Sequence, residues 1–153
     1  MGTVSNMGPG KYFTWSELTA SGTANRRGLD NTPDATSRRR LTALVREVLD
    51  PLRAKRGAPI YLSSGYRSQA VNDAVNGSKT SQHMRGEAVD MVASPLGAEE
   101  FARWIDSTGI PFDQLIWYDV GRGGHVHISH RQTGNRRQIL HAPDGGGYDK
   151  WRF

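Results

Sequence analysis

The segment SQHMRGEAVDMV, residues 81–92, joins a polar loop to a strand that carries a carboxylate. Residues 88–92 are rich in strand-forming types, and the side chains of a strand alternate between its two faces. Asp90 therefore shares a face with Ala88 and Val92, which are small and apolar. Because a bare carboxylate is costly among such neighbours, we expect Asp90 to meet a cation or hydrogen-bond donors.

A second predicted strand, residues 125–129, begins with the triplet His125-Val126-His127. His125 and His127 lie on one face of such a strand, about 7 Å apart at the usual rise per residue. An exposed polar face of a half-solvated antiparallel strand would explain the triplet alone equally well. Together with His83 and Asp90, however, the triplet favours one shared site.

The available donor types restrict the kind of metal site. The chain has no cysteine, so His, Asp or Glu must hold any metal. Two neutral imidazoles and one carboxylate suit a single zinc ion, and three protein ligands leave a fourth position for water, as catalytic sites require. A structural zinc site is normally closed by four protein ligands.

The remaining pattern is helices first and then strands mixed with helices. Thr32 is placed to cap a helix with Pro33 at its first position, and apolar residues recur at helical spacing until Leu52. Pro51 is expected to kink or end this helix, and Gly57 to stop it. Shorter helices are predicted from Ser68 to about Gly77 and around residues 101–105, and strands at residues 59–62 and 114–118. The fold class predicted is α+β, with a small antiparallel sheet that carries the metal site and helices packed on its opposite face.

Composition places the chain among ordinary folded proteins. It has 153 residues and a net charge of +5, with an isoelectric point near 9.9. The length suits one domain and a monomer. The positive charge is compatible with an anionic partner, but no nucleic-acid-binding module accompanies it and no segment approaches the roughly 20 apolar residues that span a bilayer. We therefore expect no nucleic acid and no membrane among its partners.

The motifs also carry a family resemblance. The stretches Ser64-Gly65-Tyr66-Arg67-Ser68, Ser81-x-His83-x-x-Gly86-x-Ala88-x-Asp90 and His125-x-His127 resemble the signature of zinc D-Ala-D-Ala carboxypeptidases and peptidoglycan endopeptidases. This family belongs to the LAS group of metallopeptidases, which includes the hedgehog signalling domain, so the resemblance implies a hedgehog- or D,D-peptidase-like fold. It covers roughly residues 12 to 140, and Asp30-Asn31-Thr32-Pro33 and residues 112–116 resemble a phage-associated branch.

The resemblance implies roles for particular residues. His83, Asp90 and His127 would bind the zinc ion, since the family uses the second histidine of the triplet. Arg67 would hold a substrate carboxylate, for which its planar, bidentate guanidinium is suited. Ser81 is expected to bind substrate or orient its loop, although an ordinary turn serine is an equal alternative. Gly86 is expected to let the backbone turn between loop and strand.

The general base is the point at which the pattern departs from many relatives. These carry an acidic residue three positions before the last zinc histidine, where this chain has Gly124. Asp119, at the end of the preceding strand, is our candidate for the base, with His125 and Glu87 as weaker ones. His125 is also placed to stabilise an oxyanion or move a proton. If no base exists, the alternative is a non-catalytic zinc-binding module that recognises cell-wall peptide or serves a phage particle.

The predicted function is therefore a zinc peptidase that cuts peptidoglycan stem peptides, in the manner of an endolysin or a D,D-carboxypeptidase. The predicted domain is residues 12–142, between a flexible N-terminus at 1–11 and a glycine-rich tail at 143–153. No signal peptide is visible at the start. We accordingly expect a protein made in the cytoplasm that acts at the bacterial cell wall, either released by a holin or carried on a virion.

Overall fold

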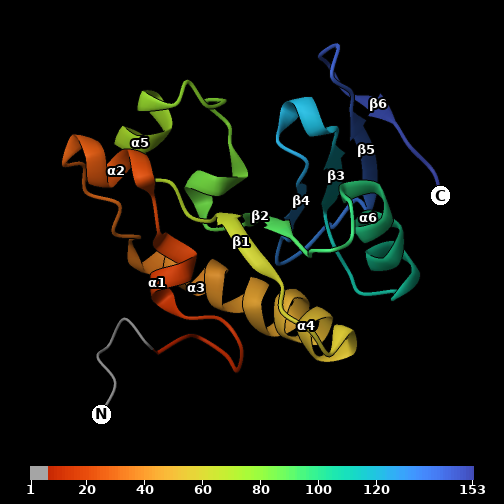
Figure 1. Cartoon of the computed structure of the whole chain (residues 1–153). Helices are drawn as coiled ribbons and strands as arrows, with labels where there is room; N and C mark the ends of the chain where they lie inside the picture. Colours follow the sequence, from red (N-terminus) through yellow and green to blue (C-terminus); the bar gives the residue numbers. More distant parts are fainter. Residues whose placement is uncertain (1–6) are drawn as a thin grey trace.

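The computed structural model describes residues 7–153 and shows an α+β protein with a six-stranded sheet in the order β1-β2-β4-β3-β5-β6 (Figure 1). The predicted flexible segment 1–11 lies partly outside the described residues. The helical elements are α1 (Trp15–Thr19), α2 (Gly22–Arg27), α3 (Ala35–Leu44), η2 (Val45–Leu49), α4 (Asp50–Arg56), α5 (Gln69–Ala74), η3 (Gln82–Arg85), α6 (Ala98–Ser107) and η4 (Val120–Arg122). The strands are β1 (Tyr61–Ser64), β2 (Ala88–Val92), β3 (Gln114–Tyr118), β4 (Val126–Ser129), β5 (Gln138–Ala142) and β6 (Asp149–Lys150).

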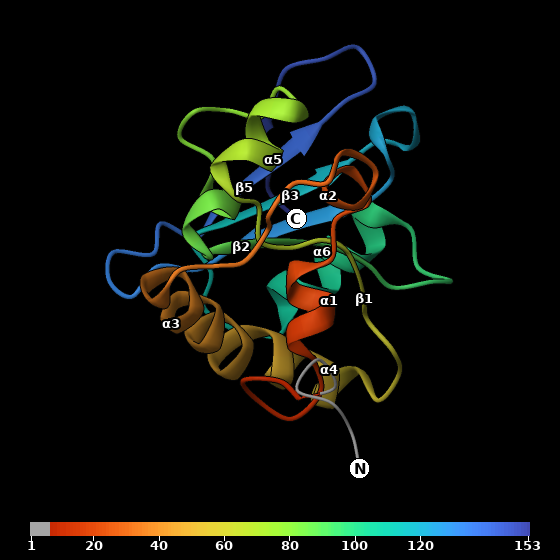
Figure 2. The same cartoon turned by 90° about the vertical axis from the view of Figure 1, so that its left-hand side faces the viewer.

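One face of the sheet is apolar and packs on the core, and the other carries polar side chains, as the alternation of residues predicts. Odd-numbered positions of β2 and β3, such as Val89 and Leu115, lie in the hydrophobic core together with Val126 and Ile128 of β4. The core is completed by apolar side chains of α3, η2, α4 and α6. Figure 2 shows α1, α3, α4 and α6 on one side of the sheet and α5 on the other. The face opposite the core carries the polar side chains, including Asp90 and His127.

The sheet is mixed rather than purely antiparallel, which corrects one part of the predicted fold. The pairs β1–β2, β2–β4 and β3–β4 are antiparallel, but β5 runs parallel to β3. The reason is the route of the chain. Because β4 runs against β3, it ends beside the start of β3, and residues 130–137 cross to the far edge of β3 and begin β5 at the same end.

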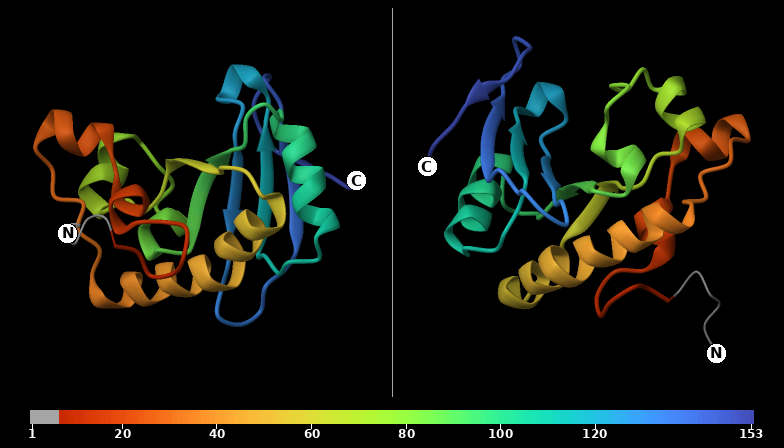
Figure 3. Two further views of the ribbon diagram at one scale, coloured as in Figure 1. Left: turned by 60° about the horizontal axis from the view of Figure 1, so that its bottom comes forward. Right: turned by 180° about the vertical axis from the view of Figure 1, so that it is seen from behind.

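The long helical segment starts later than predicted and passes through its proline. Asp34, not Thr32, is the N-cap, since its Oδ1 accepts the Ser37 N–H at 2.7 Å. The π-helical turn η2 ends two residues before Pro51, whose missing N–H removes a regular helical hydrogen bond. Helix α4 then continues to Arg56 and ends at Gly57 in the left-handed conformation, as predicted. Figure 3 shows this continuous rod running beneath the sheet.

The two ends of the described chain are attached to the rest of the fold. Near the N-terminus, the Lys11 and Tyr12 N–H groups donate to the Asp50 carboxylate at 2.7 and 3.1 Å. Near the C-terminus, β6 pairs with β5, and Trp151 packs edge-on against Trp117. No helix within residues 7–153 has both the length and the hydropathy needed to cross a bilayer.

Candidate metal centre

Three side chains converge on the polar face of the sheet, from the segments that the sequence singles out. Asp90 on β2 and His127 on β4 are direct partners in the antiparallel register, so their side chains stand next to each other. His83 reaches them from η3, the short helix just before β2. Asp90 Oδ1 lies 3.3 Å from His83 Nε2 and 3.2 Å from His127 Nδ1.

The loop around His83 is held in place by its own backbone. The Ser81 hydroxyl accepts the His83 N–H at 3.2 Å and so caps the short helix. Gly86 ends this helix with φ +76°, a conformation that favours glycine, as the expected turn requires. The His83 Nδ1 lies 2.8 Å from the Gly65 carbonyl oxygen. Because a carbonyl only accepts, Nδ1 carries the proton and the lone pair of Nε2 points to Asp90.

This donor set fits a zinc ion. One donor atom from each of His83, Asp90 and His127 lies within 4.8 Å of the others. Tetrahedral zinc with bonds of about 2.0–2.1 Å separates its ligand atoms by about 3.3 Å, close to the 3.3 and 3.2 Å between Asp90 and the two histidines. Histidine ligands of metals usually donate their other N–H to a carbonyl or carboxylate, as His83 does to Gly65.

The protonation states that the surroundings favour also suit a metal. Burial raises the pKa of Asp90, but the neighbouring imidazoles of His127 and His83 outweigh this effect and hold the pKa well below its ordinary value. Burial lowers the pKa of His127 despite the opposing effect of Asp90. The expected state is an ionised carboxylate beside a neutral imidazole, which is the form in which both residues bind metals.

His125 stands beside this trio without belonging to it. Its Nε2 lies 3.8 Å from Asp90 Oδ2. Its ring stacks on Tyr118, with centroids 4.2 Å apart. Burial lowers the pKa of His125, and Asp90 partly opposes that effect. The structure thus brings His125 within reach of the candidate centre and fixes its ring plane.

The candidate centre lies in an open cleft of about 560 Å³. Its lining residues come from the segment that contains α5 and η3, from strands β2 to β5 and from the tail. Figures 1 and 3 show the segment with α5 standing apart from strands β3 to β6. The polar residues that line the cleft include Arg67, Ser81, Gln82, His83, Arg85, Asp90, Asp113, Gln114, Tyr118, His127, Arg131, Arg136 and Tyr148. Both residues predicted to bind substrate, Arg67 and Ser81, are among them.

Arg67 has capacity for a further partner. Its NH1 donates to Asn72 Oδ1 at 3.3 Å, while its buried Nε has no hydrogen-bond partner among the described residues. Its backbone is fixed by a bond from its N–H to the His83 carbonyl oxygen at 3.2 Å. A guanidinium held in this way suits an anionic group entering the cleft.

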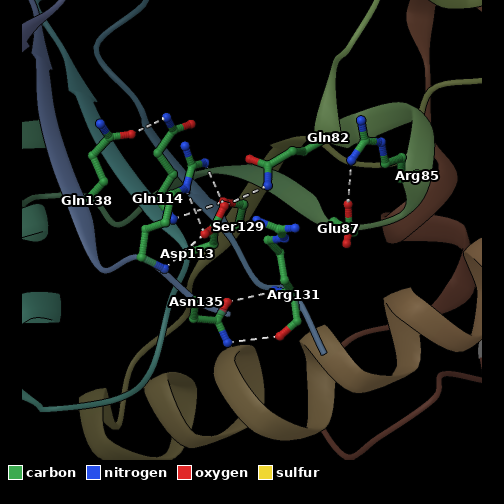
Figure 4. A network of polar contacts seen from close by, with 10 residues as sticks. Gln82, Arg85, Glu87, Asp113, Gln114, Ser129, Arg131, Asn135 and Gln138 are labelled. Atoms are coloured by element: carbon green, nitrogen blue, oxygen red, sulfur yellow. Dashed lines mark hydrogen bonds and ion pairs between the residues drawn. The ribbon is translucent and has the colours of Figure 1, made fainter. Parts of the chain in front are cut away.

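The structure does not bring Asp119 or Glu87 into the cleft. One Asp119 oxygen accepts from His141 Nε2 at 2.8 Å and the other from the Asp144 N–H at 3.1 Å, so both are occupied between β3 and the tail. Glu87 points toward Arg85 at 3.7 Å (Figure 4). Gly124, where the resemblance leads us to expect an acidic residue, has φ +58°, a conformation that favours glycine.

Two groups at the cleft were not singled out in the sequence. Asp113 is fully buried and accepts from the Arg136 Nε and NH2 at 3.0 and 2.8 Å, as well as from Gln82 (Figure 4). Tyr118 and Tyr148 meet through their hydroxyl groups at 3.4 Å, so the tail contributes to the cleft wall. The position of Asp113 just before an apolar strand indicates burial. Its partner Arg136, however, comes from the loop between β4 and β5, which the sequence does not place.

Comparison with known proteins agrees with this geometry. The family model described as Peptidase M15 matches residues 11–129, which is more than half of the chain and includes every predicted metal ligand. The chain belongs to the peptidase M15 family. Membership implies a zinc-dependent metallopeptidase, and His83, Asp90 and His127 form a possible metal site in this M15 member. A search of curated proteins found no match.

Proposed function

We propose that this M15 peptidase hydrolyses peptide bonds in peptidoglycan stem peptides, with one zinc ion held by His83, Asp90 and His127. The observation that carries the proposal is the convergence of these three donors in a cleft that also contains Arg67. Stem peptides carry free carboxylates, which match an arginine, and the net charge of +5 suits an anionic wall. Action at the cell wall follows from this substrate.

Zinc bound by these donors would supply a water of lowered pKa and polarise the substrate carbonyl. The chain's own residues supply orientation and proton transfer. Arg67 binds a carboxylate of the substrate through a charge-assisted hydrogen bond and so sets which peptide bond lies next to the ligands. Ser81 orients His83 and also faces the substrate in the cleft.

His125 is the proposed catalytic base and proton carrier. Its Nε2 lies 3.8 Å from Asp90 Oδ2, and its ring stacks on Tyr118, which lines the cleft. An imidazole can accept a proton from the attacking water and deliver it to the leaving amine. Asp119 was the first candidate for this role, but its engagement with His141 and the Asp144 N–H supports a structural role.

The test is mass-spectrometric digestion of purified stem peptides by the zinc-loaded protein. EDTA-treated wild type and the His127→Ala variant serve as metal-free controls. Cleavage by the loaded wild type alone is the expected result. The masses of the products then identify the bond, whether at the stem terminus as for a D,D-carboxypeptidase or within the peptide or cross-bridge as for an endolysin.

One observation favours a second function, a non-catalytic zinc-binding module that recognises wall peptide. It is the left-handed glycine at position 124, which leaves the usual acidic position without a carboxylate. Stoichiometric zinc in a folded protein that binds stem peptides but cuts none of them would support this alternative over the peptidase.

A further inference from the structure

The cleft has a second cationic end that the proposed chemistry does not use. At this end lie Gln82, Arg85 and Arg131, which Figure 4 labels, together with Arg136. Gln82 and Arg85 belong to η3, just before β2, and the two other arginines to the loop between β4 and β5. Ser129, the last residue of β4, follows His127 by about 7 Å along the strand. Arg131 follows two residues after Ser129, so this end lies beyond the end of β4.

The positive charges of these arginines are only partly compensated by neighbouring carboxylates. Arg136 is paired with Asp113, to which its Nε and NH2 donate hydrogen bonds at 3.0 and 2.8 Å. Arg85 has a loose contact of 3.7 Å with Glu87. For Arg131, no ion pair or hydrogen bond to its guanidinium exists among residues 7–153. The charge of Arg131 is thus the one least compensated at this end.

The backbone of Arg131, whose side chain is exposed, is nevertheless held in a defined place. The Asn135 side chain clamps its backbone, since Oδ1 accepts the Arg131 N–H at 2.8 Å and Nδ2 donates to the Arg131 carbonyl at 2.9 Å. Figure 4 shows the Arg131 side chain extending toward Gln82 and the Asp113 group. A fixed backbone lowers the entropic cost of using a long side chain to bind a ligand.

We infer that Arg131 forms a second carboxylate-binding subsite, distinct from Arg67. Arg67 follows β1 and contacts Asn72 of the α5 segment, whereas Arg131 follows β4, so the two guanidinium groups address different parts of a bound peptide. The inference rests on the proposed function and narrows the substrate to peptides with two free carboxylates. A γ-linked D-glutamate, whose α-carboxylate is free, is one stem-peptide residue with this chemistry.

The experiment compares two synthetic stem peptides that differ in one group, the free α-carboxylate of the γ-linked D-glutamate or its amide. For the wild type, kcat/KM is expected to be about tenfold higher for the carboxylate peptide, as for a partly exposed charge-assisted contact. In Arg131→Gln this ratio should fall close to one, because only the carboxylate peptide loses efficiency. Arg131→Lys should keep an intermediate ratio, since it retains the charge without the planar fork.

The matched control is Arg27→Gln, the same change of charge on exposed α2 and away from the cleft. It should retain the tenfold preference. A ratio near one in the wild type, or an unchanged ratio in Arg131→Gln, would overturn the subsite. Dissociation constants of the same two peptides, measured by titration calorimetry, carry the same prediction without turnover. If neither peptide is cut, the peptidase proposal fails while the calorimetric ratio still decides on Arg131.

Discussion

The Nδ1 of His83 lies 2.8 Å from the carbonyl oxygen of Gly65, across eighteen positions of sequence. This contact joins the loop after β1 to a proposed metal ligand and selects the tautomer whose Nε2 is free to bind. The same loop is anchored on α1, since the Tyr66 N–H donates to the Leu18 carbonyl oxygen at 2.8 Å. The orientation of His83 therefore depends on how closely residues 65 and 66 approach α1.

Substitution of Gly65 by alanine is expected to disturb the metal site from a distance. A Cβ at this position would collide with the backbone carbonyl of Leu18, so the loop must move away from α1. This movement would break the hydrogen bond between the carbonyl oxygen of residue 65 and His83 Nδ1. We expect zinc affinity to fall about 10- to 100-fold, as for other partners of metal-bound histidines. The free energy of unfolding should fall by about 1–3 kcal/mol. Chelator competition and urea denaturation measure the two effects.

Gly145→Ala is the control for this variant, because an added Cβ there meets open space. It should leave zinc affinity unchanged. A Gly65→Ala protein with wild-type zinc affinity would show that the Gly65 carbonyl does not position His83.

Removal of metal is expected to lower thermal stability. A ligand that binds only the folded state adds about 2.7 kcal/mol at a hundredfold excess over its Kd, which is a shift of about 5–10 °C for a chain of this size. Zinc should thus raise the Tm of EDTA-treated wild type, and Asp90→Asn should abolish the rise. Asp73→Asn, an exposed position on α5, should keep it. Calorimetric scans with and without zinc would argue against the site if Asp90→Asn still responds.

The sequence was sufficient to predict the polar face of the sheet. Alternation alone placed Asp90 on one face of its strand together with Ala88 and Val92, and β2 and β3 occur at the predicted residues. Alternation also put His125 and His127 on one face. It did not predict that Asp90 and His127 would be direct partners, because strand pairing and register are decided by tertiary packing.

The features that the sequence did not predict depend on where loops carry the chain from one strand to the next. The parallel strand β5 and the contact of Arg136 with Asp113 both arise from the loop at residues 130–137, which carries no periodic signal. The candidate base at Asp119 failed to reach the cleft for a similar reason. Its partner His141 lies on β5, and nothing near Asp119 in sequence indicates that this histidine will occupy its carboxylate.

The two candidate bases can be separated by paired variants. His125→Ala should keep stoichiometric zinc and lose kcat by about 10²- to 10⁴-fold, the usual contribution of a positioned acid or base. Asp119→Asn should keep most of its kcat but lose stability, because His141 and the Asp144 N–H share its two oxygens. Metal analysis, steady-state kinetics and thermal scans distinguish the roles. A large loss of kcat in Asp119→Asn, with little loss in His125→Ala, would instead identify Asp119 as the catalytic base.

Asp113 predicts how stability depends on acid. Burial raises its pKa, but hydrogen bonds from Arg136 and Gln82 outweigh this and bring the pKa to about 2, from an ordinary 3.8. A carboxyl whose folded pKa is depressed adds stability at pH values above the unfolded pKa, and that stability is lost as pH falls toward the folded pKa. The loss should therefore occur between about pH 4 and pH 2 and amount to about 2 kcal/mol.

Urea denaturation across this range provides the measurement, with Asp113→Asn as the test. The amide cannot be ionised, so this variant should be less stable than the wild type at pH 7, and the difference should shrink by about 2 kcal/mol toward pH 2. Asp73→Asn serves as the exposed control and should follow the wild-type curve closely. Parallel curves for wild type and Asp113→Asn would mean that the pKa of Asp113 is the same in the folded and unfolded protein, and would contradict its depression by Arg136 and Gln82.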